Sequence, residues 1–98
     1  MGTLRAFDTI IYGRKTVSVA GTAELLLTST FTQSVTIKAL SGNTGDVYVG
    51  DSGVTSSNGY PLSPGETISM DADHQEVLFY IDVDTNGEGV AYIAGTLA

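Results

Sequence analysis

Residues 34–50 read SVTIKALSGNTGDVYVG, and this stretch decides the fold class. Apolar and polar side chains alternate on either side of a short polar segment, so that Val35, Ile37 and Ala39 share one face. Alternation with a period of two is typical of strands that bury one face. The segment between the two runs, SGNTGD at 41–46, is rich in turn residues and predicts a hairpin.

The same alternation recurs along most of the chain. It is found in TVSVA (16–20), ETISM (66–70), EVLFYIDVD (76–84) and VAYIA (90–94). The segment GTAELLLTSTF (21–31) fits a strand at least as well as a short helix.

Two further turn signals separate these strands. SPGE (63–66) has the sequence of a type II turn, and TNGEG (85–89) contains Asn-Gly, which is typical of a type I′ hairpin. We therefore predict an all-β chain, a small antiparallel β-sandwich or β-barrel of about six to eight strands. Residues 1–15 are weakly patterned and are predicted to form an extended arm, which precedes a single β-domain at 16–98.

The charge distribution argues against nucleic acid as a partner. The net charge is −7 over 98 residues, and no cation follows Lys38. Nine carboxylates lie beyond that point: Asp46, Asp51, Glu66, Asp71, Asp73, Glu76, Asp82, Asp84 and Glu88. Affinity for nucleic acid comes mainly from cations that neutralise phosphates, so this body would be repelled. The basic first 15 residues could instead dock on an acidic neighbour, including another copy of the chain.

Membrane insertion and thiol chemistry are not expected. The longest apolar runs, VLFYI and ELLL, fall far short of the roughly 20 residues that span a bilayer. Residues 1–20 have no continuous apolar core, so a signal peptide is not expected. The chain contains no cysteine, so it can form neither a disulfide nor a thiolate metal site.

No residue pattern favours an enzyme or a bound cofactor. His74 is the single histidine, and no serine lies in a nucleophile-elbow motif. The acidic turn at 71–76 could hold a weak calcium ion, but it lacks the length and the glycine of an EF-hand loop. The glycines at 50–59 have neither the lysine nor the helix of a phosphate-binding loop, and they predict a tightly built loop. Tyrosines could also stack on sugars, with Asn58 and Tyr60 as contacts, which leaves a glycan-binding module open.

Several apolar residues fall on strand faces that are expected to meet water. They are Leu40, Tyr48, Leu78 and Tyr80. Apolar residues on both faces of VLFYI (77–81) indicate a central strand or a sheet covered by a second subunit.

Residues 33–95 resemble small structural proteins of tailed bacteriophages. The similarity is carried by a strand ending in IKA, then VYVG, VTSSNGYPL, PGE and a final pair of strands around a glycine-rich turn. The resemblance implies a virion component without enzymatic activity, cofactor or metal, built as a β-sandwich or barrel. It does not fix the position in the particle.

Among the positions that the resemblance allows, we favour a capsid decoration (cement) protein that bridges capsid subunits on the head exterior. Its expected partners are the major capsid protein and further copies of itself, with a trimer favoured, and it would be made in the host cytoplasm. A tail, neck or fibre component is the alternative. The residues expected at partner interfaces are Arg5, Arg14, Lys15, Tyr48, Tyr60, Leu78 and Tyr80.

Overall fold

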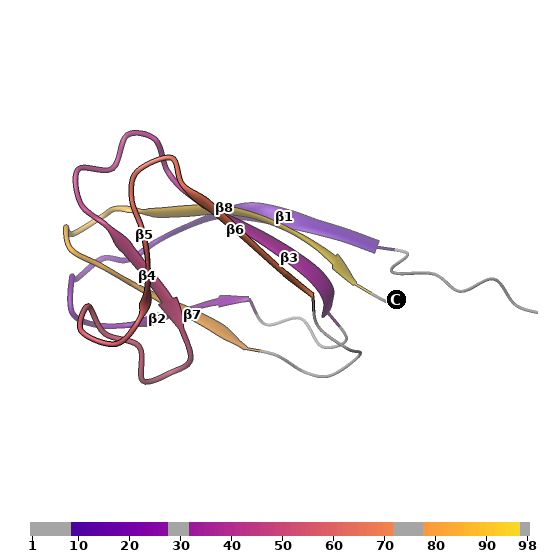
Figure 1. Ribbon diagram of the computed structural model, residues 1–98, viewed down its shortest axis with the longest axis horizontal. Coiled ribbons are helices and arrows are strands. Elements are labelled where there is room, and N and C mark those ends of the chain that lie inside the picture. The colour runs from indigo at the N-terminus through magenta and orange to yellow at the C-terminus, as the bar shows by residue number, and fades with distance from the viewer. Residues whose placement is uncertain (1–8, 28–31, 72–77, 97–98) are drawn as a thin grey trace, which may run out of the picture.

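The computed structural model describes residues 9–27, 32–71 and 78–96, and every regular element in these ranges is a strand (Figure 1). The strands are β1 (Thr9–Thr16), β2 (Glu24–Leu27), β3 (Thr32–Ala39), β4 (Val47–Gly50), β5 (Tyr60–Leu62), β6 (Thr67–Asp71), β7 (Phe79–Val83) and β8 (Gly89–Thr96). The prediction of an all-β chain is confirmed. The same ranges hold no helix with the length and apolar character needed to cross a membrane.

The strands form two antiparallel sheets that face each other (Figure 1). The β1 sheet has the order β1-β8-β3-β6, and the β2 sheet has the order β2-β7-β4-β5. Strand β1 pairs with β8, β2 with β7, β3 with β6 and β4 with β5. The chain is therefore one long antiparallel hairpin wrapped into two facing sheets, which is the eight-stranded jelly-roll arrangement. The two sheets are not hydrogen-bonded to each other into a closed barrel, so the prediction of a sandwich is confirmed and the alternative of a barrel is wrong.

One core fills the space between the sheets. The alternation in β3, β4, β7 and β8 places every second side chain there, and Ile37 and Ile81 are fully buried. The other core residues are Val17, Leu26, Leu27, Val35, Ala39, Val47, Val49, Leu62, Phe79, Val83, Val90 and Ala94. Burial of these side chains is the main force that holds the two sheets together.

Two predicted hairpins are wrong. Residues 41–46 lead from β3 in the β1 sheet to β4 in the β2 sheet, and residues 84–88 lead from β7 back to β8. Turn residues permit a chain reversal, but they do not determine whether the next strand stays in the same sheet. The SPGE turn is confirmed, because the Glu66 N–H donates to the Ser63 carbonyl at 2.9 Å and Gly65 has a φ of 85°.

The expected boundary between arm and domain also needs correction. Residues 9–15 lie in strand β1, which pairs with β8 along its whole length, so this part of the predicted arm belongs to the sandwich. Residues 1–8 lie outside the described part of the chain. The predicted strand at 16–20 ends at its first residue, and Val19 is 57% exposed in the following loop while Val17 is buried.

Four connections meet at one end of the sandwich, which we call the crossover end. They join β1 to β2, β3 to β4, β5 to β6 and β7 to β8. The Val17 N–H donates to the Glu88 carbonyl at 2.9 Å, which ties two of them together. The buried Asn43 amide donates from Nδ2 to the Gly89 carbonyl at 2.9 Å, and the same oxygen accepts the Leu40 N–H at 3.1 Å.

Carboxylates serve as acceptors for backbone N–H groups at this end. The Glu88 side chain accepts from the Thr44 N–H at 2.7 Å, the Thr44 hydroxyl at 2.9 Å and the Gly45 N–H at 3.0 Å. Donation from Gly45 is the largest cause that lowers the pKa of Glu88. Asp82 is buried and accepts the Gly21 N–H at 2.9 Å. Glu88 therefore holds the neighbouring connection at Thr44 and Gly45, and Asp82, which lies in β7, holds the β1–β2 connection at Gly21.

Candidate functional site

An exposed apolar cluster lies on the outer face of the β1 sheet. Tyr12 is 76% exposed, and its neighbours Ile10 and Ile93 are 56% and 50% exposed. Tyr12 and Ile93 are directly paired in the β1–β8 register, so the three side chains lie on adjacent strands of one face. We call this surface the β1 face. Apolar clusters that stay exposed in a small domain often mark a contact with another protein.

Two cations lie on the same face. Arg14 and Lys38 are exposed, and both are paired in register with Ala91, which lies between them. Most carboxylates of the described residues lie in the β2 sheet or in the loops: Glu24, Asp46, Asp51, Glu66, Asp82, Asp84 and Glu88. Asp71, at the end of β6, is the exception. The β1 face is therefore apolar and locally basic on an otherwise acidic molecule.

Lys15, also expected at a partner interface, pairs with a residue of its own chain. Its ammonium group forms an ion pair with Glu24 of the β2 sheet, with 2.8 Å between Lys15 Nζ and Glu24 Oε1. The Lys15 hydrogen bond is the largest cause that lowers the pKa of Glu24, followed by the Ser18 N–H. Lys15 therefore connects the two sheets within one molecule.

Tyr48 and Tyr80 lie on the outer face of the β2 sheet, as half-buried diagonal neighbours on β4 and β7. The Tyr48 hydroxyl donates to the carboxylate of Asp84, with 3.1 Å to each oxygen. Burial, and then the neighbouring Asp84, raises the pKa of Tyr48. These tyrosines are thus partly covered by their own molecule, and strand β7 is central in its sheet, as expected.

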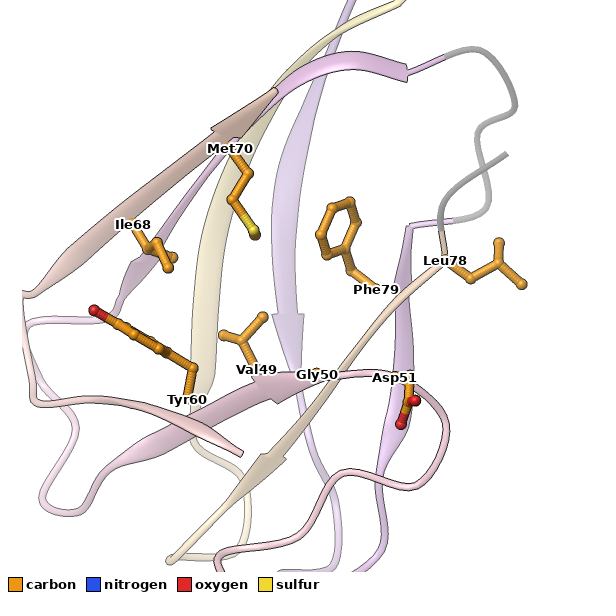
Figure 2. Close-up of a pocket in the computed structure, with 8 residues that line it drawn as sticks. All are labelled: Val49, Gly50, Asp51, Tyr60, Ile68, Met70, Leu78 and Phe79. Atoms are coloured by element: carbon orange, nitrogen blue, oxygen red, sulfur yellow. The ribbon is translucent and has the colours of Figure 1, made fainter. Parts of the chain in front are cut away.

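Tyr60 and Leu78 border an apolar groove of about 320 Å³ between the sheets, at the end away from the crossovers (Figure 2). In Figure 2 the side chains of Tyr60, Ile68 and Met70 surround the opening, while Leu78 extends away from them. The groove is lined by Val49, Gly50, Asp51, Tyr60, Ile68, Met70, Leu78 and Phe79. It offers one carboxylate and otherwise apolar surface, so it suits an apolar side chain better than a sugar.

The loop between β4 and β5, residues 51–59, is tightly built, but its own side chains hold it, and none of the positive-φ glycines of the described residues lies in it. Val54 is buried beneath it, and the Asp51 carboxylate accepts the Gly53 N–H at 2.9 Å. The Asn58 amide accepts the Thr55 N–H at 2.7 Å and donates to the Gly53 carbonyl at 3.2 Å. Both polar atoms of Asn58 are therefore used within the loop, which weakens its predicted role as a glycan contact.

Some sequence predictions fall outside the described residues. They include Arg5, His74 and all of the acidic 71–76 turn except Asp71, which is exposed at the end of β6. Among the residues that the structure does describe, no group of three or more His, Cys, Asp or Glu could hold a metal ion.

The β1 face was only partly found from the sequence. Arg14 was predicted as an interface residue, but Ile10, Tyr12 and Ile93 were not. In TIIYGRKT (9–16) three large apolar residues follow one another and are succeeded by Gly13 and two cations, so apolar and polar residues do not alternate. The alternating exposure of β1 is seen only in the structure, and the sequence alone predicts an arm there.

Comparison of this chain with protein-family models, with curated proteins and with solved structures gives no match.

Proposed function

We propose that this chain is a structural protein of a tailed-bacteriophage virion, and that it decorates the exterior of the capsid. Two lines support the proposal: the resemblance of residues 33–95 to small phage structural proteins, and the jelly-roll arrangement, which is common in viral capsid domains. A fold alone does not determine function, so the surface has to supply the argument.

The observation that carries the proposal is the β1 face. Its exposed apolar side chains are Tyr12, Ile10 and Ile93, and the exposed cations Arg14 and Lys38 lie beside them. Tyrosine and arginine are enriched in protein interfaces, where apolar contact supplies the energy and charge sets the orientation. The face suits a partner surface that is apolar at its centre and acidic at its rim, and we assign the major capsid protein to that role.

The proposed mechanism is mechanical. Each copy binds across a junction between capsid subunits that exists only in the assembled, expanded shell. A protein that binds the expanded shell but not the separated subunits stabilises the shell by mass action. Occupied sites therefore raise the free energy that is needed to separate capsid subunits.

The first experiment counts copies of the chain per purified virion by quantitative mass spectrometry. A decoration protein is present in hundreds of copies, whereas a connector or tail ring has about six or twelve by the symmetry of closed rings. A count of six or twelve would overturn decoration in favour of the neck or tail alternative. Absence from the virion would overturn the whole proposal.

The second experiment tests the face with matched variants. Tyr12→Ser combined with Ile93→Ser should lower affinity for expanded capsids that lack the protein by at least about tenfold, because two interface side chains are truncated. Val19→Ser is the control, since Val19 is equally apolar and 57% exposed but lies at the crossover end. Equal binding by the double variant and the control would overturn the role of the β1 face.

A further inference from the structure

The four edges of the two sheets differ in how well they are protected. Strand β2 has four residues and a register shift, β5 has three residues including Pro61, and β6 has five residues. Strand β1 has eight residues, no proline and an uninterrupted register with β8. Short strands, bulges, proline and charged side chains are the usual means by which proteins prevent edge-to-edge pairing. Among the described edge strands, β1 is the long one without a bulge or a proline. Of its two cations, Lys15 is paired with Glu24 of its own chain, which leaves Arg14 as the charge at this edge.

The hydrogen bonds show which backbone groups of β1 face away from β8. The Val17 N–H donates to the Glu88 carbonyl in continuation of the β1–β8 register, so the odd-numbered residues of β1 bond to β8. The Gly89 carbonyl accepts from Leu40 of the β3 side, so Gly89 does not bond to its register partner Thr16. The even-numbered residues therefore have outward-facing N–H and C=O groups: Thr16 at the end of the strand and, within it, Ile10, Tyr12 and Arg14.

Ile10, Tyr12 and Arg14 also have exposed side chains. Ile10, Tyr12 and Arg14 point to the outer face, while Ile11 and Lys15 point inward. The backbone groups available for a new strand and the apolar side chains available for contact thus belong to the same residues. A strand added at this edge would extend the β1 face without a break.

We propose that the strand added at this edge is β1 of a second copy, antiparallel about a twofold axis at Tyr12. The two β1 sheets then form one continuous eight-stranded sheet. In this register Tyr12 is opposite the partner's Tyr12, and Arg14 is opposite the partner's Ile10. Each of these is a hydrogen-bonded pair, because all of the outward-facing groups belong to even-numbered residues.

An identical strand matches this edge, because its outward-facing backbone groups have the same spacing and belong to residues of the same apolar face; charge then decides the register. Strand β1 carries Arg14 and Lys15 and no carboxylate, and Lys15 is already paired with Glu24 of its own chain. With the axis at Tyr12, the two Arg14 residues lie four positions apart along the strands, about 13 Å, so like charges are not opposed. An axis at Gly13 would bring them about 7 Å closer along the strand and is disfavoured.

The pairing also changes the expected symmetry. Sequence reasoning favoured a trimer, whereas an edge that pairs with itself closes as a dimer. The dimer would present two β1 faces side by side and so double the apolar surface offered to a partner. The inference does not depend on the proposed function, because self-association is measured on the purified chain without capsids.

The test is the mass in solution, measured by light scattering after size exclusion and by sedimentation equilibrium at several concentrations. We expect twice the chain mass for the natural chain. Tyr12→Pro should give the monomer mass, because proline removes an outward N–H but no bond to β8. Tyr12→Ser keeps the N–H and should dimerise, with a weaker association constant. A natural chain that is monomeric or trimeric at all concentrations would overturn the proposal, as would equal effects of the two variants.

Hydrogen exchange followed by NMR keeps the proposal testable if Tyr12→Pro fails to fold. In the natural chain the Ile11, Gly13 and Lys15 amides are bonded to β8 and should exchange slowly at every concentration. The Ile10, Tyr12 and Arg14 amides should exchange slowly only at concentrations where the dimer forms. Fast exchange of these three amides at high concentration would refute pairing at this edge.

Discussion

Substitution of Asn43 tests how the crossover end is held together. Asn43 Nδ2 donates to the Gly89 carbonyl at 2.9 Å, but that oxygen keeps a second donor in the Leu40 N–H at 3.1 Å. Asn43→Ala therefore removes one hydrogen bond without leaving the carbonyl unsatisfied. We expect it to lower the free energy of unfolding by about 1 kcal/mol, the typical net value of one bond, and not by the larger cost of an orphaned group.

Asn43→Asp should behave differently and should depend on pH. At pH 7 it places a carboxylate against a carbonyl oxygen in a buried position, which removes the donor and adds a charge. We expect a loss of about 3–5 kcal/mol there, the range for an uncompensated buried charge. Burial without a donor raises the folded-state pKa of the new carboxyl above its unfolded value near 3.9, so the stability deficit is largest above the folded pKa. It should shrink as the pH falls and, once the protonated group donates to the Gly89 carbonyl as Asn43 does, it should fall below the alanine value.

Urea denaturation of the natural chain and both variants, at about pH 7 and about pH 4, measures these differences. The comparison is made between variant and natural chain at each pH, because acid also affects other carboxylates. The reasoning is refuted if Asn43→Asp and Asn43→Ala lose the same free energy at both pH values. It is also refuted if Asn43→Ala costs more than about 3 kcal/mol, since the carbonyl would then have no effective second donor.

Three further predictions concern single positions. The pKa of Glu88 is lowered in the folded state. Its contribution to folding stability is therefore present above the unfolded pKa and is lost as the pH falls through the folded pKa. Glu88→Gln removes this contribution and should flatten the acid side of a plot of melting temperature against pH. Gly89→Ala should cost at least about 2 kcal/mol in urea denaturation, because a Cβ there would overlap the backbone carbonyl oxygen of Lys15, and an unchanged midpoint would contradict this. Val54→Ala removes two buried methyl groups beneath the β4–β5 loop and should lower the free energy of unfolding by about 2 kcal/mol. It should also speed hydrogen exchange of the loop amides. Unchanged, slow exchange would show that the side-chain hydrogen bonds are sufficient to hold the loop.

The sequence predicts most of the strands and their buried faces. Val35, Ile37 and Ala39 are buried as the alternation requires, because a strand with one face on a core must alternate. The connections were harder to predict, since the turn at 41–46 has the composition of a hairpin but crosses between sheets. Which sheet receives the next strand is decided by long-range pairing, and that information is not local.

The candidate site was predicted less well than the fold. Tyr60 and Leu78 border the groove, Tyr48 and Tyr80 lie on the β2 sheet, and Arg14 lies on the β1 face, so the expected interface residues do not form one surface. Alternation identifies the residues on the outer side of a strand. It does not tell which outer faces become neighbours, because that depends on the strand order.

The pairing of the first strand with the last has a kinetic consequence. Thr9 lies opposite Thr96, so β1 has no complete partner until residue 96 has left the ribosome. Strand β3 also borders β8, and the β1 sheet is therefore incomplete until the last strand arrives. Contacts between residues so distant in sequence require closure of a long loop first, which slows folding. We expect the nascent chain to leave β1 unpaired, with Ile10 and Tyr12 on it, until β8 has been synthesised, and to depend in the cell on the late docking of β8.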